Sequence, residues 1–145
     1  MSKRILVPVN RTMDVERVLT VVRGIARTSG ATVRLVAVIP IPEPLRDRSD
    51  RVIVSTDTQI DRLERRAMEE LRAMAGLALD GVPVETRVVF GEPAEEIAIE
   101  AECFDADLVV VTEAPRWRLR AALAGLMPQG VFGRPFPARV LHMPA

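Results

Sequence analysis

Few side chains in this 145-residue chain could act as nucleophiles, general bases or metal ligands. Lys3 is the only lysine, so no lysine is placed to hold a nucleotide phosphate or form a Schiff base. His142 is the only histidine, which excludes zinc sites built from several histidines. With one tryptophan and no tyrosine, the chain also lacks the aromatic platform that binds single-stranded nucleic acids. We predict that the protein is not an enzyme.

Cys103 and His142 remain as candidate reactive groups, and each also has a structural interpretation. Cys103 could be a reactive thiol, but Glu102 and Asp105 beside it are unfavourable neighbours for a thiolate. We expect Cys103 to be a semi-buried apolar side chain. His142 lies in a short apolar segment, where a structural or interface histidine is more common than a catalytic one. The sequence therefore predicts no catalytic residue and no metal site.

Charge and hydropathy restrict the partners and the location of the protein. Lysine and arginine together number 20, as do aspartate and glutamate, so no net charge attracts nucleic acid. No apolar run approaches the roughly 18 residues of a membrane span, and residues 5–9 are too short for a signal peptide. A single cysteine cannot form an internal disulfide, which agrees with a reducing compartment. We expect a cytoplasmic protein without membrane or nucleic-acid partners.

Short apolar runs alternate with segments of helical periodicity along the chain. With 145 residues, 48% of them apolar, it has the size and composition of a single domain, residues 1–145. Unbroken apolar runs predict strands that are covered on both faces. The alternation therefore favours an α/β fold, an open parallel sheet with helices on both faces. The expected strands are residues 4–9, 32–39, 82–90, 107–112 and 138–142.

Helix starts and stops can also be predicted from capping residues. Thr12 is the expected N-cap of the first helix, and Gly30 ends it. Thr56 and Gln59 fit a capping box for the second helix, which Gly81 ends. Between these helices, residues 40–55 form a proline-rich, charged loop in this prediction.

A third helix is expected after Gly91 and Glu92, with Pro93 in its first turn. Its apolar residues recur at helical spacing and predict one buried face. The acids between them are expected to stay in solvent, namely Glu95, Glu96, Glu100 and Glu102.

Four segments in register resemble the universal stress protein family, and the resemblance covers residues 4–142. They are residues 4–9, 30–33, 91–97 and 106–111. The resemblance implies an adenine-nucleotide alpha-hydrolase-like fold, with a five-stranded parallel sheet in the order 3-2-1-4-5. It also implies a regulatory or interaction protein of the stress response, usually a homodimer. Members of the family divide into those that bind ATP and those that do not.

The ATP-binding members carry a glycine-rich loop of the form G-x2-G-x9-G-S/T after the fourth strand. Aligned on residues 107–111, the three glycine positions are Thr112, Pro115 and Gly125, and the hydroxyl position is Leu126. Glycines let backbone N–H groups approach phosphates. Pro115 has no N–H and cannot adopt a positive φ, and Leu126 replaces the hydroxyl with an apolar chain. Only Gly125 keeps the residue of the family pattern.

Two further family positions lie outside this loop. Asn10 stands where binding members have an aspartate near the ribose, and its amide can still form hydrogen bonds. Val38 stands where an apolar residue contacts adenine, although a valine in a buried strand is usually core. Each lost hydrogen bond to a charged phosphate costs roughly 1.5–3 kcal/mol. Two or three losses weaken a micromolar complex by about two to five orders of magnitude, so we predict no bound ATP and no cofactor.

Two alternative functions remain. The first is a nucleotide-binding stress protein with a rewired phosphate site for ATP or AMP, and its residues would be Asn10, Val38, Gly125, Arg116, Arg118 and Arg120. The second is an adenylate-handling enzyme, which is disfavoured because the HxGH and SGGxDS motifs are absent.

The last predicted strand suggests how the chain assembles. Val140 and Leu141 lie on an expected edge strand, whose unpaired backbone groups need a cover. Antiparallel pairing across a two-fold axis supplies one, and the family commonly does this. We therefore expect a homodimer through Ala138–Met143, with an unidentified protein as a further partner.

Overall fold

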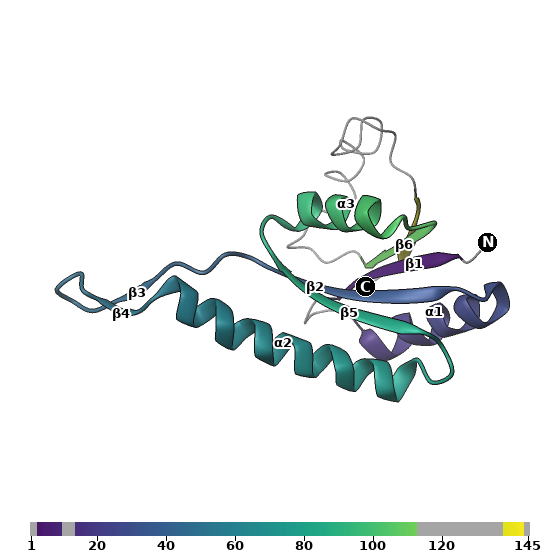
Figure 1. The fold of residues 1–145 in the computed structure, drawn as a ribbon, viewed down its shortest axis with the longest axis horizontal. Coiled ribbons are helices and arrows are strands. Elements are labelled where there is room, and N and C mark those ends of the chain that lie inside the picture. Colours follow the sequence, from purple (N-terminus) through teal and green to yellow (C-terminus); the bar gives the residue numbers. More distant parts are fainter. Residues whose placement is uncertain (1–2, 10–13, 113–137, 144–145) are drawn as a thin grey trace.

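A five-stranded parallel sheet organises the computed structural model, which describes residues 3–9, 14–112 and 138–143 (Figure 1). Its strand order is β5-β2-β1-β6-β7, and every pairing is parallel. This order confirms the predicted fold class and order, because β5 is the third and β6 the fourth predicted strand. The strands are β1 (Arg4–Val9), β2 (Thr32–Ile39), β5 (Val84–Phe90), β6 (Leu108–Thr112) and β7 (Arg139–Met143).

Helices cover both faces of the sheet, and two apolar clusters result. Helices α1 (Val15–Ser29) and α2 (Thr56–Ala78) pack on one face, and α3 (Pro93–Phe104) packs on the other. In β1, Ile5 and Val7 point to the first cluster and Leu6 points to the second, as the alternation of a strand requires. β1 is thus buried on both faces, which explains its unbroken apolar sequence.

The helix ends differ in detail from the predicted caps. Asp14, not Thr12, is the N-cap of α1, and its carboxylate accepts a hydrogen bond from the Arg17 N–H at 3.2 Å. Gly30 ends α1 as predicted, with a left-handed φ of 68°. Ser55, not Thr56, caps α2 by accepting from the Thr58 N–H.

The predicted capping box is wrong because its glutamine has another partner. The Gln59 amide donates to the Glu43 carbonyl at 2.7 Å and so ties α2 to the preceding segment. At its other end α2 stops at Ala78, three residues before the predicted Gly81, which lies in the following turn with φ 77°. Short-range capping patterns cannot anticipate such tertiary competition for one side chain.

The segment predicted as a loop contains a short hairpin, β3 (Leu45–Arg46) and β4 (Val52–Val54). The Asp47 carboxylate closes the turn by accepting from the Ser49 and Arg51 N–H groups at 2.8 and 2.9 Å. Asp50 supplies the positive φ of 63° that the turn needs. Figure 1 shows the hairpin projecting beyond the sheet at the start of α2.

Candidate functional site

The centre of the sheet has the arrangement that forms ligand crevices in open α/β folds. β1 lies between β2 and β6, and its connection to β2 runs through α1 on one face of the sheet. The connection into β6 runs through α3 on the opposite face. Because these two connections run on opposite faces, the carboxyl ends of β1 and β6 form the candidate binding edge.

The structure describes two of the predicted site residues, Val38 and Thr112. Both lie near this edge, and each is only 6% exposed. Val38 packs in the cluster beneath α3 with Leu6 and Ile97. Val111 belongs to the same cluster, so strand alternation turns Thr112 toward the opposite face. The fold brings the two residues to one edge but points their side chains in opposite directions.

The other predicted positions lie outside the described residues. These are Asn10, Pro115, Gly125 and Leu126, together with the alternative arginines Arg116, Arg118 and Arg120.

Two helices begin at the candidate edge, and both N-termini are occupied by the chain's own carboxylates. A free helix N-terminus attracts anions through its unpaired N–H groups. In α1 the Asp14 carboxylate accepts a hydrogen bond from the Arg17 N–H. In α3 the Glu92 carboxylate accepts from the Ala94 and Glu95 N–H groups at 3.2 and 2.9 Å. These two helix ends therefore present negative charge toward any phosphate.

Gly91 connects β5 to α3 at the same edge. Its N–H donates to the Ile39 carbonyl at 2.9 Å, which extends the β2–β5 ladder past the last strand residue. Its φ is 152°, in the region that favours glycine. The Glu96 side chain lies over it, and an added Cβ would come within 2.6 Å of the Glu96 carboxylate oxygen. This part of the edge is thus closed by a second acid of α3.

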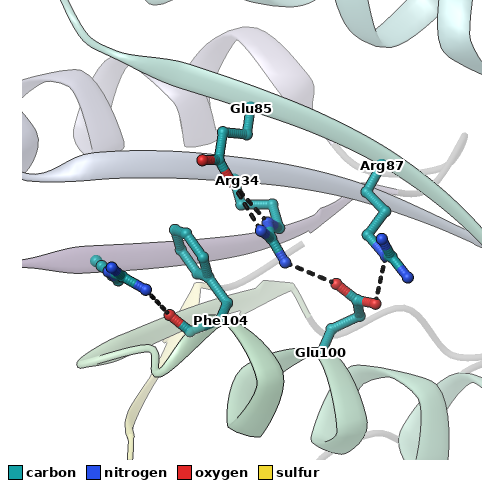
Figure 2. Close-up of polar contacts among 6 residues, drawn as sticks. Arg34, Glu85, Arg87, Glu100 and Phe104 are labelled. Atoms are coloured by element: carbon teal, nitrogen blue, oxygen red, sulfur yellow. Dashed lines mark hydrogen bonds and ion pairs between the residues drawn. The ribbon is translucent and has the colours of Figure 1, made fainter.

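Glu100 corrects the prediction that the acids of α3 stay in solvent, because its side chain is only 4% exposed. One carboxylate oxygen accepts from Arg87 Nε at 2.6 Å, and the other accepts from Arg34 Nη1 at 3.3 Å. Arg34 also donates to Glu85 at 2.8 Å (Figure 2). The burial of this carboxylate is compensated by two guanidinium groups, as a buried charge requires.

Phe104 completes this ion-pair cluster on the α3 face. The Arg34 guanidinium lies over the Phe104 ring, 4.3 Å from its centroid. Arg4 donates from Nη1 to the Phe104 carbonyl at 2.8 Å, close to the α3 C-terminus. Together these contacts connect α3 to β1, β2 and β5. Each carboxylate oxygen of Glu100 accepts a hydrogen bond, so the cluster has a structural role.

A sequence signal for this cluster exists, although sequence reasoning missed it. Glu100 follows Ile97 by three residues and adjoins Ala101, so helical periodicity places it on the buried face. Arg34 is the one charged residue of β2, and it lies on the same face of the sheet as α3. An acid and a base on the inner faces of two packed elements predict an ion pair.

Neither Cys103 nor His142 is part of a described site. Cys103 is exposed, so the prediction of a semi-buried side chain is wrong. His142 is partly buried in β7, opposite Val111, and its Nδ1 is buried with no described hydrogen-bond partner. Among the described residues, no group of three histidine, cysteine or acidic side chains could hold a metal ion. No described helix is long and apolar enough to cross a membrane.

The architecture defines a parallel α/β domain whose chain connections diverge at β1 and β6. Comparisons with known proteins place it in a family. A model of the universal stress protein family matches residues 1–131. The chain therefore belongs to the universal stress protein family, which confirms the resemblance noted in the sequence. No curated protein matches it.

Solved structures share the fold at low sequence identity. A universal stress protein from Burkholderia pseudomallei is 22% identical with a TM-score of 0.65, over 99% of this chain and 96% of that one. The hypothetical protein MJ0577 is 19% identical with a TM-score of 0.71, over 99% and 97%. A universal stress protein from Archaeoglobus fulgidus, solved with dAMP, is 19% identical with a TM-score of 0.55, over 97% and 96%.

Proposed function

We propose that the chain is a regulatory or interaction protein of the universal stress protein family that does not bind ATP and is not an enzyme. The observation that carries this proposal concerns Thr112. At the position of the first loop glycine, Thr112 is a buried residue of a regular strand, paired with Met143. A β-branched residue suits this strand but cannot supply the conformational freedom of glycine.

Charge at the candidate edge supports the same proposal. The N-termini of α1 and α3 are capped by Asp14 and Glu92, and Glu96 lies over Gly91. A triphosphate approaching this edge would meet carboxylates rather than free N–H donors. The residues Pro115 and Leu126, at the other loop positions, remove a donor and a hydroxyl. A cytoplasmic location fits this role.

A nucleotide-binding function with a rewired site is the second candidate. It is favoured by two structural neighbours, one solved with dAMP and one with cAMP. On this chain the site would use Asn10, Val38 and Gly125, and arginines would replace the glycine-rich loop. These arginines are Arg116, Arg118 and Arg120, and the ligand would be ATP or AMP.

Thermal unfolding with and without ATP and magnesium separates the two candidates. If ATP bound with a dissociation constant near 10 μM, about 1 mM would stabilise the fold by about 2.7 kcal/mol. For a domain of this size the melting temperature would rise by roughly 5–10 °C. We expect a rise of less than about 1 °C, within the scatter of such scans. Mass spectrometry of small molecules released on denaturation should detect no adenine nucleotide.

A loop restored to the family pattern serves as the converse experiment. The variant combining Thr112→Gly, Pro115→Gly and Leu126→Ser should gain a thermal response to ATP, because it regains flexible N–H donors and the hydroxyl. A clear response of the unmodified protein, abolished by Arg116→Ala with Arg118→Ala and Arg120→Ala, would contradict the proposal and favour the rewired site.

We also propose a homodimer through Ala138–Met143, with β7 as the pairing strand. The Arg139 N–H donates to the Asp107 carbonyl, so residues 139, 141 and 143 face β6 and residues 140 and 142 face outward. Val140 and Leu141 pack partly against the two core clusters. A substitution at either would therefore damage the core as well as the interface, which makes His142 the better test position.

Light scattering of His142→Pro tests this homodimer. Proline at 142 removes an outward N–H without breaking the ladder to β6. We expect the dissociation constant of the β7 contact to rise at least about tenfold, since two symmetry-related hydrogen bonds are lost. His142→Ala keeps the N–H and should leave this contact in place. Equal effects of the two substitutions would contradict pairing through this strand.

A further inference from the structure

β5 forms the other edge of the sheet, and it lacks the bulge, proline and lysine that often protect an edge strand. Its seven residues pair with β2 from Val84 to Phe90 without a bulge. The strand contains no proline and no lysine, which commonly block edge pairing. Among the described residues, no strand pairs with its outer edge. A long, regular edge of this kind is a template for another strand.

The outward-facing backbone groups of β5 can be assigned from two hydrogen bonds at its ends. The Val33 N–H donates to the Pro83 carbonyl, and the Gly91 N–H donates to the Ile39 carbonyl. In a parallel ladder, every second residue of a strand directs its N–H and C=O groups toward the neighbouring strand. The odd-numbered residues from 83 to 91 therefore face β2. The N–H and C=O groups of Val84, Thr86 and Val88 therefore face away from the sheet.

We propose that β5 pairs with β5 of a second copy of this chain, antiparallel and about a two-fold axis at Thr86. This register places Thr86 opposite Thr86 and Val84 opposite Val88, each as a hydrogen-bonded pair. It places Glu85 opposite Arg87 as a pair without backbone hydrogen bonds, where side chains approach most closely. Threonine pairs, aliphatic pairs and opposite charges are all favourable across antiparallel strands.

The neighbouring registers place like charges opposite each other. Charge therefore favours the register whose two-fold axis lies at Thr86. A two-fold axis at Glu85 would place two carboxylates directly opposite each other. An axis at Arg87 would place two guanidinium groups opposite each other. Like charges in that position are destabilising. Glu85 and Arg87 are 52% and 55% exposed on the α3 face, so both can reach a second copy.

The flank of α2 beside β5 is mostly exposed. A groove of about 450 Å³ runs along this helix, and Thr86 donates its hydroxyl hydrogen to the sulfur of Met68 in its lining at 3.2 Å. The groove therefore lies next to the proposed axis. It carries both signs of charge, so an identical surface is not repelled, and it is lined by Asp61, Glu64, Arg65, Met68, Glu69 and Arg72.

Disulfide cross-linking tests the register. The test uses a Cys103→Ser background, because Cys103 is exposed and could cross-link on its own. Two Cα atoms in a hydrogen-bonded antiparallel pair are about 5.5 Å apart, within the range of a disulfide. Thr86→Cys should therefore form covalent dimers under mild oxidation. Val88→Cys should not, because residue 88 lies opposite residue 84. Absence of the first cross-link, or equal yields from both, would overturn the proposal.

Equilibrium sedimentation separates this contact from pairing through β7. In the His142→Pro background, the chain should still form dimers at about 100 μM, and these should depend on β5. Adding Thr86→Pro should raise their dissociation constant at least about tenfold, because the outward N–H of both copies is lost. Thr86→Val keeps that N–H and should not. A His142→Pro variant that is wholly monomeric would overturn the β5 contact while supporting the one through β7.

Discussion

Replacing Glu100 by glutamine should lower the free energy of unfolding by about 3 kcal/mol, the lower end of the cost of breaking a buried ion pair. Its carboxylate is 4% exposed and accepts hydrogen bonds from Arg34 and Arg87. Glutamine has nearly the same shape, so the core beside Ile97 and Ala101 stays filled. The loss therefore reports the missing charge rather than a cavity.

Most of this loss in unfolding free energy should come from the weakened pairing of the Arg34 guanidinium. Its side chain is 20% exposed and lies over the Phe104 ring, whereas Arg87 is 55% exposed and can turn to water. Arg34 keeps Glu85 as a partner, which holds the loss near the lower end of the range. For a chain of this length, about 3 kcal/mol corresponds to a fall of roughly 10 °C in melting temperature.

Chemical denaturation of Glu100→Gln and of Glu95→Gln measures this effect with a matched control. Glu95 lies on the same helix but is exposed, so its substitution should cost less than about 1 kcal/mol. Arg87→Gln should be less destabilising in the Glu100→Gln background than alone, with a coupling of at least about 0.5 kcal/mol. Equal losses for the two glutamate variants would mean that the ion-pair cluster does not hold α3 on the sheet.

The strands and their order could be predicted because both depend on patterns that tertiary contacts reinforce. The unbroken apolar run at residues 4–9 exists because β1 is buried on both faces. The left-handed conformation at Gly30 is likewise a local requirement, and the predicted helix end is confirmed. The expected caps at Thr12 and Thr56 were wrong because neighbouring Asp14 and Ser55 offer the same chemistry.

The ion-pair cluster on the α3 face was harder to predict than the fold, since it depends on contacts between distant residues. Glu100 meets Arg34 across 66 positions of the sequence, and no local pattern contains that pair. The prediction of one solvated set for the acids of α3 overlooks that helical periodicity separates Glu100 from exposed Glu95. The hairpin was missed for a related reason, because the Asp47 side chain forms the turn that its short strands need.

Replacing Gly91 by alanine should also destabilise the fold, by about 2 kcal/mol or more. A φ of 152° costs a residue with a side chain of order 1–3 kcal/mol. The added Cβ would also lie 2.6 Å from the Glu96 carboxylate oxygen and 2.8 Å from its Cγ, so this side chain must move. Its displacement would disturb the start of α3 at the candidate edge. We expect the melting temperature to fall by roughly 6–10 °C.

Two further variants separate the backbone cost from the contact with Glu96. Glu96→Ala removes the contact and should make Gly91→Ala less costly, while the strain at φ remains. Gly24→Ala in the exposed middle of α1 meets no atom within 4 Å and should stabilise the fold by about 0.5–1 kcal/mol. If alanine were tolerated equally at Gly91 and Gly24, the turn from β5 into α3 would not need its glycine. The position of Glu96 over residue 91 would then not depend on the positive φ that glycine adopts readily.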